Sequence, residues 1–176
     1  MPKISDVRKR DAEATKKRIL LSAKKAFAKK GLAGARVDDI AENASANKRM
    51  IYHYFGNKEA LFLKTLEDAY LDIRLAEQKL ELDKLSPKDA LDKLVCFTWN
   101  YYIANPEFIT LVNSENLHKA KHLKQSKIIS DINQKFISMV GKLLDRGVSE
   151  GVFRDDVDPV QLNITITAIG YYYLTN

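Results

Sequence analysis

The stretch VDDIAENASANKRMIYHYF, from Val37 to Phe55, decides how this chain is interpreted. Its apolar residues recur every three or four positions, which is the period of an amphipathic helix and not of a strand. Two short helices are predicted, over Val37–Ala44 and Lys48–Phe55. Only residues 45–47 separate them, which is too short for a wide loop, so a tight turn is expected between the two helices.

Two helices joined by a three-residue turn form the helix-turn-helix arrangement, in which the second helix lies in the major groove of DNA. Lys48 and Arg49 stand at the N-terminus of the second segment, where side chains of this motif reach base edges. Tyr52, His53 and Tyr54 follow, with apolar residues interleaved. So many donors and aromatic rings on one short helix are hard to explain as core packing, and an ordinary solvated helix is the alternative to DNA contact.

Charge is unevenly distributed along the 176 residues, whose formal net charge is +6. Residues 1–58 contain 15 Lys and Arg against 6 Asp and Glu, whereas the remainder contains 14 against 17. A basic module followed by a mildly acidic one suits a partner that carries phosphate groups. Charge alone leaves two such partners open, nucleic acid and an anionic membrane surface.

The other segments also favour helices, because Gly and Pro are scarce, with 7 and 4 copies, and no convincing strand is found. The polar stretch 118–126 is the best candidate for a loop. Gly31 and Gly151 are expected to end helices, and Asn57 and Ser86 to cap them. The chain is therefore predicted to be all-α, with further helices over about 13–30, 58–82, 87–104, 107–116, 127–150 and 158–174.

Several other classes of protein lack their signatures here. One cysteine, Cys96, cannot form an intrachain disulfide, and no secretory signal is present, so a cytoplasmic protein is expected. No stretch reaches the roughly 18 apolar residues of a membrane span. No catalytic motif or glycine-rich phosphate loop is found, so neither an enzyme nor a cofactor is expected. His118 and His122 are four residues apart, but a loop surface is favoured over a metal site.

A longer run, TKKRILLSAKKAFAKKGLAGARVDDIAENASANKRMIYHYFGNKEAL, resembles the DNA-binding domain of the TetR family of bacterial transcriptional regulators. The resemblance implies an N-terminal three-helix helix-turn-helix domain, residues 1–58, followed by a helical ligand-binding and dimerisation domain, residues 59–176. It implies a ligand-responsive repressor that binds an operator as a homodimer and is released by a small-molecule effector. The matching elements are the spacing of Ile19, Ala23, Phe27 and Gly31, and the segments Val37–Ala41, Ile51–Phe55 and Asn57–Leu61.

The resemblance also nominates the residues that contact double-stranded DNA. Lys48 and Arg49 are candidates for base edges, and Met50 and Tyr52 for a base or a thymine methyl group. The candidates for phosphate contact are Arg36, His53, Tyr54 and Lys58.

The chain departs from the family pattern at several of these positions. Ser45 and Ala46 stand where the family usually has a glycine and then a buried valine, so looser packing of the two short helices is expected. Arg36 follows Ala35 where a threonine often precedes the first of them, so a cap is lost and a cation gained. Arg49 stands where the family usually has glycine or alanine, and Met50 stands where it usually has threonine. These two changes are expected to alter the bases recognised.

The second half is expected to hold an effector between helices, with aromatic walls and polar groups that orient it. Plain core packing stays the alternative for these residues. Dimerisation is expected through 127–150 and 158–174, whose aromatic surface needs a partner. Because the chain stops within this apolar region, either a final helix is lacking or the regulator is shorter than most relatives. The effector candidates are Trp99, Asn100, Tyr102, Phe108, Glu115, Phe136 and Met139.

The basic N-terminal segment, Lys3–Lys17, is a candidate arm that follows the DNA backbone or enters the minor groove. A solvated tail is the alternative. A competing function for the whole chain is a basic helical adaptor that binds an anionic membrane surface or a protein partner. The chain lacks a basic amphipathic helix with large exposed apolar residues, which argues against the adaptor.

Overall fold

The computed structural model describes residues 4–176, with side-chain surroundings from residue 11 onward. These described residues form nine α-helices and one 3₁₀ helix and contain no strand, which confirms the all-α prediction. The chain divides into two compact units. The first unit runs up to Asp68 and takes in Thr110–Leu123, and the second comprises Ala69–Ile109 and Lys124–Asn176. The units thus divide the chain differently from the expected domains, 1–58 and 59–176.

The helices follow the predicted order. In the first half they are α1 (Ile4–Gly34), α2 (Val37–Asn43), α3 (Lys48–Phe55) and α4 (Lys58–Gln78). In the second half they are the 3₁₀ helix η1 (Leu82–Lys84), α5 (Pro87–Ala104), α6 (Pro106–Leu117), α7 (Lys121–Gln125), α8 (Lys127–Ser149) and α9 (Pro159–Thr175).

Local signals placed several helix ends correctly. Asn57 accepts a hydrogen bond from the Ala60 backbone N–H at 2.8 Å, and Ser86 accepts one from the Asp89 N–H at 3.2 Å. These side chains supply acceptors to N–H groups that have no partner within the helix. The predicted caps at Asn57 and Ser86 are therefore confirmed.

Two expectations about helix positions were wrong, and one about a helix end was confirmed. α1 begins at Ile4 and not near residue 13, because residues 4–12 carry no continuous apolar stripe that periodicity could detect. Gly31, with φ of 66° and ψ of 177°, interrupts the helix as predicted, and a short helical piece follows it to Gly34 within α1. The predicted loop 118–126 contains α7, whose first turn is held by a carboxylate from another helix.

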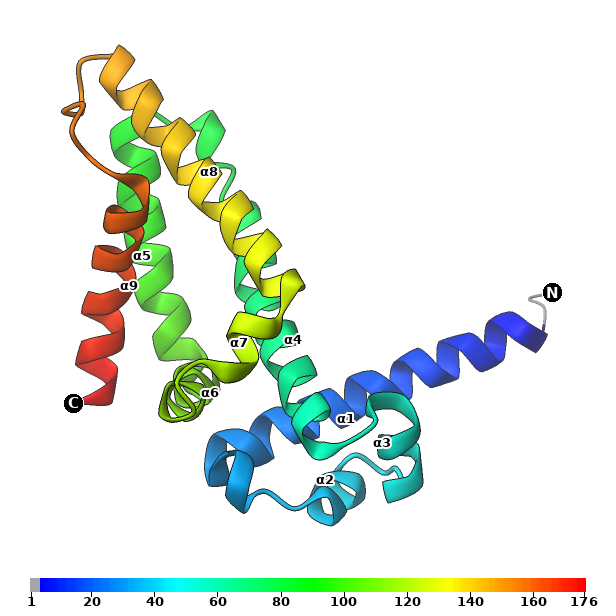
Figure 1. Cartoon of the computed structure of the whole chain (residues 1–176). Coiled ribbons are helices and arrows are strands. Elements are labelled where there is room, and N and C mark those ends of the chain that lie inside the picture. The colour runs from blue at the N-terminus through cyan, green and yellow to red at the C-terminus, as the bar shows by residue number, and fades with distance from the viewer. Residues whose placement is uncertain (1–3) are drawn as a thin grey trace. The chain divides into compact units, whose positions relative to one another are not determined.

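The first unit is built on α1, which packs against α2 and, through aromatic contact, α4 (Figure 1). The rings of Phe27 and Phe62 meet edge to face, with their centroids 5.1 Å apart. Ser22 donates a hydrogen bond to the Ile40 carbonyl at 2.9 Å, and Arg18 Nε donates one to the Ala44 carbonyl at 3.2 Å. These bonds hold the end of α2 on α1 and so fix the position from which α3 starts.

In the second unit, α5, α8 and α9 lie side by side (Figure 1). Arg146 of α8 donates to three backbone carbonyls around η1, at 2.8 to 3.1 Å, and thereby holds η1 against α8. No helix within residues 4–176 combines the length and the hydrophobicity needed to cross a bilayer. The buried core consists of Leu82, Ala90, Leu94, Phe136, Val140, Leu143 and Leu144.

Candidate nucleic-acid interface and second-unit cavity

The position of α3 is set by a cap at one end and an anchor on one face. The Asn47 side chain accepts a hydrogen bond from the Met50 backbone N–H at 2.8 Å, which starts the helix at Lys48. Ile51 is fully buried and anchors α3 in the core of the first unit. The first turn and the side opposite Ile51 are left available for contact with a partner.

All eight predicted DNA-contacting residues lie in the first unit, on or beside α2 and α3 or at the start of α4. Five of them have exposed side chains: Arg36, Lys48, Arg49, Tyr52 and His53. The other three, Met50, Tyr54 and Lys58, are half-buried.

Lys48 forms an exposed ion pair with Asp38 of α2, with 3.0 Å between Nζ and Oδ1. The hydrogen bond to Asp38 raises the pKa of Lys48 above its usual value, so its ammonium stays charged. About half of each side chain is exposed to water. Because water screens such pairs strongly, the attraction is weak, and an incoming phosphate group can replace the carboxylate.

Tyr54 and Lys58 also have contacts with α1 that the sequence did not reveal. The ammonium of Lys16 lies 5.5 Å from the centroid of the Tyr54 ring. Lys58 Nζ donates a hydrogen bond to the carbonyl of Ala33 at 3.0 Å, 25 residues away in the chain. Both residues therefore help to hold the motif together, whatever contact they make with DNA.

The predicted N-terminal arm falls partly outside the described residues. From Ile4 onward its backbone belongs to α1, where Lys16 pairs with Glu13 at 2.9 Å. Lys3 and the side chains of Lys9 and Arg10 lie outside the part of the chain that the structure describes.

The turn between α2 and α3 shows the consequence of replacing the usual glycine. Ser45 has φ of 48°, in the left-handed region that glycine adopts readily and other residues adopt at a cost. The turn is nevertheless closed by a hydrogen bond from the Ala46 N–H to the Ala41 carbonyl at 2.9 Å. The departure thus takes the form of backbone strain in an intact turn. Arg36, as predicted, provides no side-chain cap for α2.

The seven predicted effector residues are not gathered into one site. Phe136 and Met139 line the same cavity in the second unit. Tyr102 and Phe108 are buried against each other instead, with stacked rings 5.9 Å apart. Trp99 lies against the Tyr173 ring, with 5.0 Å between the centroids. The remaining two are Asn100, which is exposed, and Glu115, which belongs to the first unit.

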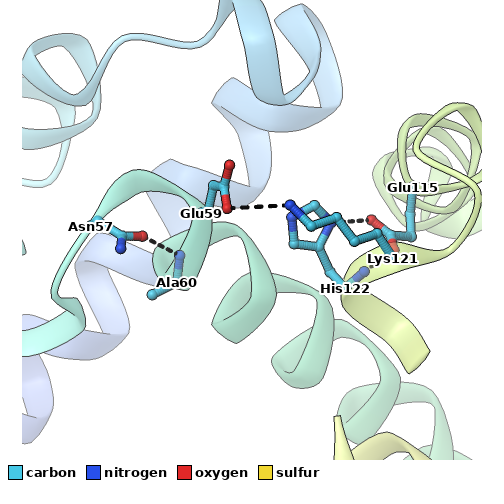
Figure 2. A network of polar contacts seen from close by, with 6 residues as sticks. All are labelled: Asn57, Glu59, Ala60, Glu115, Lys121 and His122. Carbon is cyan, nitrogen blue, oxygen red and sulfur yellow. Dashed lines mark hydrogen bonds and ion pairs between the residues drawn. The ribbon is translucent and has the colours of Figure 1, made fainter. Parts of the chain in front are cut away.

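Glu115 is completely buried and joins α6 to α7 (Figure 2). Its carboxylate accepts hydrogen bonds from the backbone N–H groups of His122 and Leu123 at 2.7 and 3.0 Å. The other oxygen lies 2.7 Å from His122 Nδ1. Beside this network, Lys121 pairs with Glu59 at 3.7 Å. Within the described residues, His, Cys, Asp and Glu side chains form no group of three or more that could hold a metal ion.

The cavity that Phe136 and Met139 line has a volume of about 330 Å³ and lies between α4 and α8. Its polar wall contains Arg74, whose guanidinium lies 3.9 Å from the centroid of the Phe136 ring and pairs with Glu77. Burial raises the pKa of Glu77 to about 7, although Arg74 acts in the opposite direction. Neither residue is among the predicted effector contacts, because charged side chains on an amphipathic helix are ordinarily assigned to its solvent side.

The two parts of this chain each match a known protein family. Residues 19–65 match the family described as "Bacterial regulatory proteins, tetR family". Residues 87–176 match the one described as "Tetracyclin repressor-like, C-terminal domain". The first match contains the helix-turn-helix motif, and the second contains α5 to α9.

Individual proteins agree with these matches. The chain is 38% identical over 170 residues to the HTH-type transcriptional repressor NicS of Pseudomonas putida, covering 97% of this chain and 80% of that protein. It is 41% identical over 108 residues to the HTH-type transcriptional repressor SCO4008 of Streptomyces coelicolor, of which it covers 53%. The solved structure of the putative transcriptional regulator SCO4942 from Streptomyces coelicolor aligns with a TM-score of 0.68 and 28% identity, covering 92% of this chain and 80% of that one.

The fold and the exposed first turn of α3 define a helix-turn-helix DNA-binding regulator. The chain belongs to the TetR family of bacterial transcriptional regulators. The family expected from Thr15–Leu61 is thereby confirmed, and so is the class of function.

Proposed function

We propose that the protein is a repressor that binds an operator as a homodimer and releases it when a small molecule occupies its second half. The observation that carries DNA binding is the exposure of Lys48 and Arg49 at the capped N-terminus of a helix anchored by buried Ile51. The names of NicS and SCO4008 support repression. In this proposal residues 1–58 contact DNA in the cytoplasm, and residues 59–176 bind the effector and the second copy.

Two arginines are assigned different roles within the interface. Arg49, in the first turn of α3, is proposed to contact a guanine, a pairing that discriminates by about 1–3 kcal/mol against a wrong base. Arg36, beside the start of α2, is proposed to meet phosphate, which contributes equally on every sequence. Arg36 is a cleaner phosphate probe than Lys58, whose ammonium is bonded to the Ala33 carbonyl.

Fluorescence anisotropy with an operator duplex, selected from genomic fragments, tests this division. Arg49→Ala should weaken operator binding far more than binding to random duplex. Arg36→Ala should weaken both equally and reduce the slope of log K against log salt by about one. Lys84→Ala, which removes an exposed charge from the second unit, is the matched control and should change neither. Equal losses on both duplexes for both arginine variants would refute the assignment.

Dimerisation is proposed to use α8 and α9. Ile169, Tyr172 and Tyr173 of α9 are 63%, 70% and 67% exposed, a large apolar surface for one helix. A second copy that covers it would hold two recognition helices about 34 Å apart, one turn of DNA. Sedimentation equilibrium should show a dimer at micromolar concentration, weakened by Ile169→Glu but not by Val152→Glu in the loop before α9. A strict monomer would contradict the two-half-site arrangement.

A further inference from the structure

The cavity between α4 and α8 combines an apolar wall with a mostly buried cation. Leu71 and Leu75 of α4 face Ile132, Phe136 and Met139 of α8 around it. Into this lining comes the side chain of Arg74, which is 14% exposed. A cation so far removed from water requires partners, because its hydration is lost.

Arg74 has an incomplete set of partners. One terminal nitrogen, Nη1, pairs with Glu77, and the guanidinium lies over the Phe136 ring. Its Nε is buried and has no hydrogen-bond partner. A buried donor without an acceptor is costly, so this position lacks one acceptor. A carboxylate fits, because its two oxygens match the fork of donors that a guanidinium presents.

We propose that this cavity is the effector site and takes a small monocarboxylate with a compact apolar or aromatic body. The carboxylate accepts hydrogen bonds from Arg74, and the body packs against Phe136 and Met139. A volume of about 330 Å³ lies at the lower end for small-molecule sites, which restricts the body to a compact one. The inference rests on the proposed function and names the chemical class of its effector.

Charge in the wall favours an anion over a cation. Lys135 of α8 also lines the cavity, so two basic residues stand against the single acid, Glu77. The groups that interact electrostatically with Glu77 are Arg74 on its own helix and Tyr101 and Tyr102 on α5, and Lys135 on α8 lines the same cavity. Burial raises the pKa of both tyrosines above the usual value of 10, so their hydroxyl groups stay uncharged near neutral pH.

Binding of a carboxylate is therefore linked to the protonation of Glu77. A second anion beside Arg74 repels ionised Glu77 and favours its neutral form, so the site takes up a proton with the ligand. In the protein without ligand the pKa of Glu77 is about 7, so the affinity for a carboxylate should fall as pH rises above 7. A neutral ligand in the same cavity should show no such fall.

The test uses isothermal titration of the full chain with benzoate, phenylacetate and hexanoate, each compared with its amide. At least one acid should bind, and at pH 6.5 it should bind about tenfold or more tightly than its amide, which is the effect of one charge-assisted hydrogen bond. Equal binding of an acid and its amide, or no binding of any of the three acids at about 10 mM, would overturn the proposal.

Matched variants locate the binding. Glu77→Gln should keep the affinity for the acid and lose its pH dependence. Adding Arg74→Met to Glu77→Gln should lower the affinity of the Glu77→Gln variant at least tenfold. Neither variant contains a buried carboxylate without its ion-pair partner. Lys142→Met on α8, outside the cavity lining, is the control. If the double variant fails to fold by circular dichroism, Glu77→Gln with Arg74→Lys, which keeps the charge but not the fork, should still weaken binding. Unchanged affinity in the folded double variant would refute the site.

Anisotropy with the operator separates this inference from the function on which it rests. A bound acid should release the operator. An acid that binds more tightly to the DNA-free protein must, by linkage, weaken DNA binding by the same factor. Binding of the acid without release would refute the effector role. Failure of the chain to bind any duplex would instead overturn the proposed function, whatever the titrations show.

Discussion

The two ion pairs Lys48–Asp38 and Arg74–Glu77 occupy opposite environments. The side chains of the first pair are 50% and 53% exposed, and those of the second are 14% and 3% exposed. Water screens the first pair, so it contributes little to stability and leaves Lys48 ready for phosphate. Burial makes the second pair costly to break and raises the pKa of Glu77. An exposed ion pair thus leaves its lysine available for the phosphates of DNA, whereas a buried ion pair makes its glutamate responsive to a proton or a small anion.

Removing one member of the buried pair should have the largest effect. Arg74→Met is expected to lower the free energy of unfolding by about 3–5 kcal/mol at pH 8, because it removes the buried ion pair and the contact with the Phe136 ring and leaves Glu77 buried without a partner. The part caused by the buried charge, about 1 kcal/mol for a pKa near 7, should be absent at pH 5, where Glu77 is protonated, and also when Glu77→Gln is added. Urea unfolding at the two pH values measures it. An equal loss at both would show that the buried charge is not the cause.

Neutralising Glu77 should remove part of the pH dependence of stability. The pKa of Glu77 is about 7 in the folded chain and 4.5 when the side chain is fully solvated, as in the unfolded chain. Between these pH values the folded chain therefore binds more protons than the unfolded chain. Stability should therefore fall as pH rises from about 4.5 to 7, by up to ~3 kcal/mol. Glu77→Gln should flatten this fall in urea titrations, whereas Glu81→Gln, at an exposed site, should not. Identical slopes for wild type and Glu77→Gln would contradict the pKa.

The turn between α2 and α3, in the exposed region, offers a test of backbone strain. Ser45→Gly should raise the free energy of unfolding by about 1 kcal/mol, because glycine relieves the strain of φ at 48°. Ala46→Gly, beside it and without positive φ, should lower stability by about 0.5–1 kcal/mol through the greater freedom of the unfolded chain. Urea midpoints of the two variants give the comparison. A loss for Ser45→Gly would mean that its side chain contributes more than the strain costs.

Breaking the exposed pair should have the smallest effect on stability. Asp38→Asn should leave the urea midpoint unchanged, since the pair it removes is screened by water. Affinity for duplex DNA should rise, together with its salt dependence, because Lys48 is released and a negative charge is removed from the interface. Asp83→Asn in the second unit is the control for charge alone. Weaker DNA binding by Asp38→Asn would show that Asp38 positions Lys48 and does not compete with phosphate.

Sequence reasoning worked best where the signals are local. The limits of α3, the caps at Asn57 and Ser86 and the exposure of Arg49 all follow from residues within one or two turns of each other. It failed for Glu115, whose interaction with the start of α7 depends on a turn that polar composition could not predict. It also gave no hint that Arg74 meets Phe136, since the two are far apart in the chain.

The amino-acid sequence by itself determined the helices, the motif and the chemistry of its exposed first turn, because period, caps and spacing are encoded over a few neighbouring residues. The tertiary structure alone decided which charged residues are buried. Burial depends on the packing of α4 against α5 and α8, and desolvation is what moves the pKa of Glu77 and leaves the Nε of Arg74 without an acceptor.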